Sequence, residues 1–237
     1  MTMITAVSGR GFALITGDRI LIKHEENGSR NVCATDSTKG QRLSDFVLCA
    51  DAGIVGINDE IFRRLGDRIN ANSDLAECSK ELNEVMLEIV CDEDFEYYDS
   101  IQTKPFRSYI LLAGFNSDGS TDVIQHNIDF GEVRIDNQTL AENYAVDCGW
   151  CAYDDPTEYR LQSLYQELFH IPREEIESLT LEKAQTRSSV FHYIGARITP
   201  NSATLDFDVL SLKRADNGEL VFEKSYDDGM LGEELGQ

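Results

Sequence analysis

The sequence predicts an α+β protein folded as a four-layer αββα sandwich, in which two β-sheets pack face to face and a pair of helices covers each outer face. Strand patterns at the start, middle and end of the chain are separated by two pairs of segments with helical periodicity. The 237 residues are also enough to bury a sizeable core within one domain. We therefore expect a single domain spanning residues 1–237, with a flexible acidic tail from about residue 227.

The first half of the chain predicts a hairpin, a buried strand and two helices. The turn sequence at 8–11 joins the two apolar runs of the hairpin, and a polar stretch at 23–42 separates the hairpin from the next strand. That strand ends in a strand-to-helix turn at 51–53, and Ser73 or Asp74 is a candidate N-cap for the second helix. The expected elements are strands over 3–7, 12–15 and 46–50 and helices over 56–71 and 75–89.

The second half repeats this order and ends in a further hairpin. Turn residues at 116–119 and 216–218 each join two strand-like runs, and the alternating pattern before the second turn is typical of a strand with one buried face. The two helical segments follow acidic or threonine-containing capping sequences. The expected elements are strands over 106–115, 121–128, 144–150, 203–212 and 220–224 and helices over 159–169 and 181–193.

Composition narrows the range of partners. Forty-three acidic residues against 21 basic ones give a formal net charge of −22, which repels nucleic acid and anionic membranes. No segment approaches the roughly 20 apolar residues needed to span a bilayer, and the N-terminus does not resemble a signal peptide. We expect a cytoplasmic protein whose six cysteines remain thiols.

Several motifs occur in an order and spacing that resemble the proteasome β-subunit and its bacterial ring-protease relatives, which are N-terminal-nucleophile (Ntn) hydrolases. Thr2 precedes Asp18 by sixteen positions, and Lys39 precedes Gly53 by fourteen. Further matching motifs are Gly11-Phe-Ala-Leu-Ile-Thr-Gly-Asp-Arg19, Asp59, Lys104-Pro-Phe106, Leu111-Leu-Ala-Gly-Phe115, Asp118-Gly119 and Ile128-Asp-Phe-Gly131. The resemblance covers residues 2–151; after that only the order of helices and strands agrees.

The resemblance implies a catalytic site made of Thr2, Asp18, Lys39 and Gly53. A threonine hydroxyl needs a base, and the α-amine of Thr2 can accept its proton once Met1 is removed. Lys39 would stabilise the alkoxide-like form, Asp18 would pair with Lys39, and the Gly53 N–H would stabilise the oxyanion. The expected activity is hydrolysis of peptide or amide bonds. Taken singly, Asp18 and Lys39 also fit surface ions, and Gly53 fits a turn residue.

The same resemblance implies a homo-oligomer acting on a peptide or protein substrate, and no cofactor or metal is expected. The sequence does not identify an ATPase partner. The four histidines share no spacing that would suggest a metal cluster or a Ser/His/Asp triad.

Two departures from the family pattern also fit other functions for this protein. Cys148 stands where the family has a serine that supports the terminal amine, and residues 197–202 lack the family's aspartate. These departures, together with a retained Met1, would fit a non-catalytic structural subunit that self-assembles. The pair Cys148 and Cys151 would also fit a redox or zinc site, although a zinc site would need two further ligands.

Overall fold

The computed structural model describes residues 3–24, 30–34, 36–53, 55–92, 107–129, 132–141, 144–150, 155–199 and 204–227. It contains both helices and antiparallel sheets, which confirms the predicted mixed α/β class. No helix within these ranges is long and apolar enough to cross a bilayer.

A six-stranded antiparallel sheet combines strands from the N-terminal part of the chain with strands from its middle and its C-terminal part. Its central strands β1 and β2 form the predicted N-terminal hairpin, in which Ile4 lies opposite Gly17 and the turn residue Gly11 has a φ of 79°. The strand order is β10-β11-β1-β2-β12-β13. The bounds are β1 Met3–Gly9, β2 Phe12–Asp18, β10 Thr139–Ala141, β11 Tyr144–Trp150, β12 Phe207–Arg214 and β13 Leu220–Asp227.

The remaining strands form a five-stranded sheet and a separate two-stranded sheet. The five-stranded sheet has the order β5-β6-β7-β8-β9, with every neighbouring pair antiparallel. Its bounds are β5 Gly40–Arg42, β6 Val47–Ala52, β7 Arg107–Phe115, β8 Thr121–Asp129 and β9 Glu132–Asn137. The two-stranded sheet pairs β3, Leu21–His24, with β4, Arg30–Ala34.

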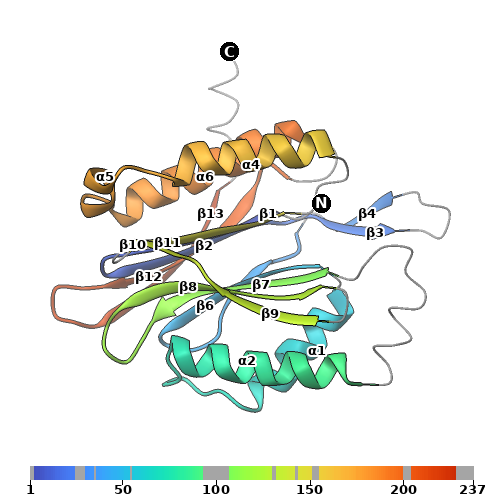
Figure 1. The fold of residues 1–237 in the computed structure, drawn as a ribbon, viewed down its shortest axis with the longest axis horizontal. Coiled ribbons are helices and arrows are strands. Elements are labelled where there is room, and N and C mark those ends of the chain that lie inside the picture. The colour runs from blue at the N-terminus through green and yellow to red at the C-terminus, as the bar shows by residue number, and fades with distance from the viewer. Residues whose placement is uncertain are drawn as a thin grey trace.

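The helices cover the outer faces of the two large sheets. Figure 1 shows α4, α5 and α6 over the six-stranded sheet and α1 and α2 beneath the five-stranded sheet. Asp74, rather than Ser73, caps α2, and it forms a capping box with Glu77. The bounds are α1 Val55–Gly66, α2 Leu75–Val90, α4 Asp155–Phe169, α5 Arg173–Glu177 and α6 Leu181–Ile198.

Three clusters of buried apolar side chains hold these layers together. The α6-side cluster lies between the six-stranded sheet and α4 and α6, and it includes Met3, Val146 and Phe191. The α2-side cluster joins the five-stranded sheet to α1 and α2. The inter-sheet cluster takes mostly alanine, isoleucine and leucine side chains from both sheets. Burial of this apolar surface supplies the main driving force for the layered arrangement.

The structure corrects several predicted elements. The polar stretch at 23–42 contains the end of β3 and all of β4 and β5, because backbone pairing alone can form short strands without an apolar pattern. Strands β9 and β10 and the short helix α5 were not predicted either. The helix expected over 56–71 ends at Gly66, and Ile69 packs against the α2-side cluster from the following loop.

Near the C-terminus the predicted element types are right and their bounds are wrong. Helix α6 continues to Ile198, five residues beyond the predicted end, while β12 begins only at Phe207. Strand β13 continues to Asp227, and the tail expected to be flexible, residues 228–237, lies outside the described residues.

Candidate active site

Asp18, the last residue of β2, is a fully buried carboxylic acid. Its Oδ1 accepts a hydrogen bond from the backbone N–H of Met3 at 3.1 Å, while its buried Oδ2 has no hydrogen-bond partner within the described part of the chain. Burial raises the pKa of Asp18 to about 7, and the Met3 N–H and the charge of Lys39 oppose that rise. The end of β2 therefore carries a carboxyl group that changes its charge near neutral pH.

Lys39 lies beside this carboxyl group. Only 7% of it is exposed, and a Cβ built on Gly17 would lie 2.8 Å from the Lys39 Cβ, so Gly17 makes room for the lysine against β2. Lys39 attracts Asp18 electrostatically, but within the described residues their charged atoms form no ion pair at 4.0 Å or less. The structure thus brings together the two residues that the sequence suggested, and their direct pairing stays a prediction.

The start of β1 is fixed from two sides. The backbone N–H of Met3 bonds Asp18, and its buried side chain packs against α6, where a Cβ on Gly195 would lie 2.0 Å from the Met3 Cε. Thr2, the expected nucleophile, and Met1 lie outside the described residues. Met3, the residue that follows Thr2 in the chain, is therefore bonded to the carboxyl group suggested for the site.

Gly53 occupies the turn between β6 and α1. It is exposed and has a φ of 129°, a backbone conformation that side-chain-bearing residues rarely adopt. The requirement for glycine at this turn is confirmed, and the role of its N–H as an oxyanion donor stays a prediction.

Cys148 lies on β11 opposite Thr5, within the α6-side cluster. Burial raises the pKa of its thiol well above the ordinary value, and the charge of Asp147 adds to the rise. A buried neutral thiol is a poor nucleophile and a weak hydrogen-bond donor, so the site favours a packing role. Cys151 lies outside the described residues, among which no group of three or more His, Cys, Asp or Glu side chains is arranged to hold a metal ion.

Three polar residues that the sequence did not indicate as site residues form a chain of hydrogen bonds that begins next to Lys39. The Asp51 N–H donates to the Lys39 carbonyl oxygen at 3.0 Å, and the Asp51 Oδ2 accepts from the Asn58 Nδ2 at 2.8 Å. The Asn58 Oδ1 in turn accepts from the Ser108 Oγ. The one available signal was the position of Asn58, a polar residue next to the apolar stripe of α1.

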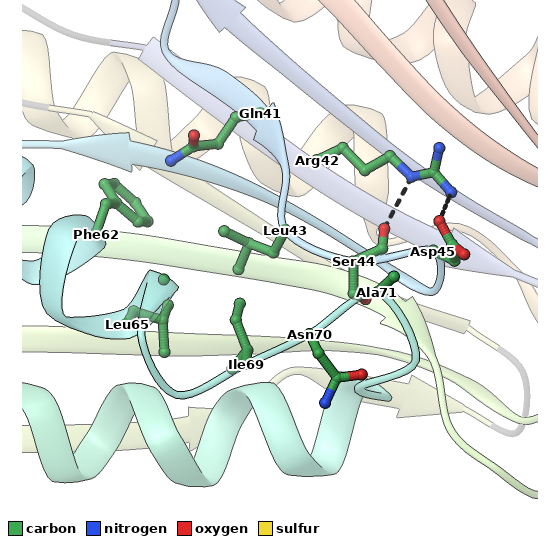
Figure 2. A pocket seen from close by; sticks show the side chains of 11 residues that line it. Gln41, Arg42, Leu43, Ser44, Asp45, Phe62, Leu65, Ile69, Asn70 and Ala71 are labelled. Atoms are coloured by element: carbon green, nitrogen blue, oxygen red, sulfur yellow. Dashed lines mark hydrogen bonds and ion pairs between the residues drawn. The ribbon is translucent and has the colours of Figure 1, made fainter.

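An open groove lies on another part of the surface. It has a volume of about 450 Å³ and lies between the loop after β5 and the loop after α1, with Leu43, Phe62 and Ile69 among its apolar lining. Figure 2 shows Arg42 at one side of it, bonded to Ser44 and Asp45. Asp18, Lys39, Gly53 and Cys148 do not line this groove, so it is separate from the site that they define.

Comparison with solved structures identifies the fold. Among 421 matching chains is eukaryotic HslV from Trypanosoma brucei, with a TM-score of 0.53, 15% sequence identity, and coverage of 88% of this chain and 99% of the HslV chain. HslV is a proteasome-type Ntn hydrolase. This chain has the proteasome-type fold. Comparisons with protein-family models and with curated protein sequences return no match.

Within the proteasome-type fold, Lys39 connects the two large sheets. On one side it packs against Gly17 of the six-stranded sheet, and on the other its carbonyl accepts from Asp51 of the five-stranded sheet. Of the suggested site residues, Asp18 and Lys39 come from separate segments that this fold brings together. At 15% identity the match establishes the fold, and the chemistry must be argued from the residues.

Proposed function

We propose that this chain is a threonine-dependent Ntn hydrolase that cleaves peptide or amide bonds, with Thr2 as the nucleophile after removal of Met1. The observation that carries the proposal is the buried pair of Asp18 and Lys39, in which Asp18 contacts Met3, the first residue of β1. Asp18 bonds the residue next to Thr2, and the Lys39 ammonium lies within electrostatic reach of Asp18. Buried opposite charges beside a candidate nucleophile are typical of a reactive site.

The first half of the reaction forms an acyl-enzyme. The α-amine of Thr2 takes the proton of the Thr2 hydroxyl while the oxygen attacks the carbonyl carbon of the scissile amide. The Lys39 ammonium stabilises the developing charge on that oxygen, and Asp18 offsets the charge of the buried lysine. The Gly53 N–H stabilises the oxyanion of the tetrahedral intermediate. The C–N bond then breaks, and the leaving amine takes the proton from the Thr2 α-amine.

The second half of the reaction regenerates the enzyme. Water attacks the Thr2 ester after giving a proton to the α-amine, and the ester C–O bond breaks as the Thr2 oxygen recovers that proton. The product is a carboxylic acid. These reaction steps use only side chains, the Gly53 backbone N–H, a terminal amine and water, so they need neither a metal nor a cofactor.

The proposal extends to the organisation of the molecule. We infer a single unit spanning residues 1–237 with the four-layer αββα arrangement of the Ntn hydrolases, a cytoplasmic location, and self-association into a homo-oligomer. The layers of helices and sheets in Figure 1 and the match to HslV support the first of these inferences. The likeness to proteasome subunits supports self-association.

Intact mass and peptide hydrolysis test the proposal together. The purified full-length chain should have a mass lacking Met1 and should hydrolyse a panel of fluorogenic peptides, and Thr2→Ala should abolish this activity. Thr186→Ala is a matched control, because Thr186 is exposed on α6 and, among the described residues, its hydroxyl bonds only the local Glu182 carbonyl. Activity that survives in Thr2→Ala would exclude the threonine mechanism. A mature protein that keeps Met1 and is inactive would instead be a non-catalytic structural subunit.

A further inference from the structure

We propose that Lys39 lies between two carboxylates, and that Asp51, held in place by Asn58 and Ser108, is a second positioning residue beside Asp18. The catalytic part of this inference rests on the proposed function. The charge arrangement itself is a property of the fold and can be measured without activity.

The backbone sets Asp51 next to Lys39. Gly40 of β5 pairs with Ala50 of β6, and the bond from the Asp51 N–H to the Lys39 carbonyl continues this antiparallel pairing by one residue pair. Residues that face each other in this way have Cβ atoms about 4.5–5.5 Å apart, and opposite charges at such positions attract. Lys39 and Asp51 are therefore neighbours that the strand pairing itself aligns.

A buried relay orients the Asp51 carboxylate. The Ser108 hydroxyl donates to the Asn58 Oδ1, and the Asn58 Nδ2 donates to the Asp51 Oδ2 at 2.8 Å. Asn58 is 2% exposed and Ser108 is fully buried, so the amide needs partners at both ends. The relay joins β7, α1 and β6, and it fixes one oxygen of the carboxylate from the core side.

The charges that act on Asp51 come from Lys39, which precedes β5, and from Asp59 on α1. Burial raises the pKa of Asp51, the bond from Asn58 and the charge of Lys39 lower it, and the charge of Asp59 on α1 raises it. Asp51 in turn contributes to the raised pKa of Cys49 on β6. Among these groups only Lys39 is cationic, and it also lowers the pKa of Asp18.

Two carboxylates suit the lysine because only 7% of the residue is exposed. A charge on such a residue needs compensation, and within the described residues neither Asp18 nor Asp51 forms an ion pair with it at 4.0 Å or less, so each carboxylate acts on it at longer range. Asp51 supplies a second anion from the opposite sheet. Together the two carboxylates hold the ammonium at the junction of the sheets, which is where the proposed mechanism needs it.

Carboxyl NMR titration of the full-length chain tests the charge arrangement without reference to activity. With aspartate labelled at the carboxyl carbon, Lys39→Met should raise the titration midpoints of both Asp18 and Asp51, by about one pH unit. Asp147, a half-buried aspartate whose pKa is raised to about 7 without any influence of Lys39, is the internal control. A rise for Asp18 with no change for Asp51 would overturn the proposal.

Kinetics then test the positioning role. We expect Asp51→Asn and Asn58→Leu to lower kcat about tenfold with little change in KM and to shift the pH profile, while the exposed Asp67→Asn keeps wild-type activity. Ser108→Ala tests the relay with a smaller change if Asn58→Leu does not fold. A rise in KM confined to peptides with a basic side chain, at unchanged kcat, would make Asp51 a substrate contact and overturn the positioning role. An inactive wild type would refute the proposed function while leaving the NMR result to decide the charge arrangement.

Discussion

Replacing Asp18 with asparagine should stabilise the fold and abolish the proposed activity. The pKa of Asp18 rises from 3.8 to about 7 on folding, mainly through burial, so the folded protein keeps a proton that the unfolded chain releases. A rise of this size corresponds to about 4 kcal/mol of destabilisation when the carboxylate is ionised. Asparagine carries no charge to bury, and its side-chain oxygen can still accept the Met3 N–H.

The sign of the effect depends on pH in a defined way. Below pH 3.8 the Asp18 carboxyl is protonated in both states and costs nothing, and the wild type loses stability as the pH rises from there through about 7. The free energy of unfolding of Asp18→Asn should therefore exceed that of the wild type by little at pH 3.5 and by up to about 4 kcal/mol at pH 8. Urea denaturation curves at intervals across this range measure the difference.

Asp147→Asn is the matched control for this experiment. Asp147 is half-buried and its pKa is also raised to about 7, but it lies on β11 and its Oδ1 accepts from the Cys148 N–H rather than from the start of β1. Both variants should show the same pH-dependent gain in stability, and only Asp18→Asn should lose peptide hydrolysis. A stability difference that does not change with pH, or a less stable Asp18→Asn at pH 8, would show that burial of the Asp18 charge does not limit stability.

Three further substitutions probe the packing around the site. Gly17→Ala should displace Lys39, because the new Cβ would lie 2.8 Å from the lysine Cβ, and hydrolysis should fall at least tenfold with little change in far-UV circular dichroism. Gly195→Ala should change the free energy of unfolding in urea by no more than about 1 kcal/mol, because its Cβ would displace only the flexible end of Met3, 2.0 Å away, and alanine favours the helix more than glycine does. His192 is buried and its pKa falls to about 3, so stability should be lost as the pH drops from 6.5 toward 3. His192→Phe should flatten that acid limb, and an unchanged limb would show that other groups control it.

The helices and strands that could be predicted from the sequence are those with a periodic pattern of apolar side chains. The stripe of α2 from Leu75 to Ile89 is buried along one face, and the predicted Asp74 cap is present. Strand β4 has no such pattern, because pairing with β3 depends on backbone groups that every residue carries. Ile69 fits the helical spacing of α1 but lies in the loop after the helix and packs against the α2-side cluster from there. Apolar spacing indicates which side chains are buried and does not determine the backbone conformation.

The candidate site likewise contains some residues that the sequence could indicate and others that it could not. Asp18 and Lys39 could be suggested from their spacing, and the structure brings them into electrostatic contact across a glycine. The relay through Asn58 and Ser108 could not be predicted from the sequence, because these two residues are 50 positions apart and meet only when α1 packs on β7. Asp51 becomes a candidate only through that contact and its backbone bond to Lys39.

Burial of a carboxylate does not by itself mark a reactive site in this protein. Asp147 has the same raised pKa of about 7 as Asp18, and therefore the same cost of about 4 kcal/mol when ionised, against a typical total stability of about 5–15 kcal/mol. The two differ in their surroundings. Asp18 faces a buried lysine and bonds the residue that follows Thr2, whereas the influences on Asp147 are its own burial, a backbone N–H and the like charge of Asp136. The opposite charge of Lys39 and the bond to Met3, and not the cost of burial, distinguish Asp18 from Asp147 and support its proposed catalytic role.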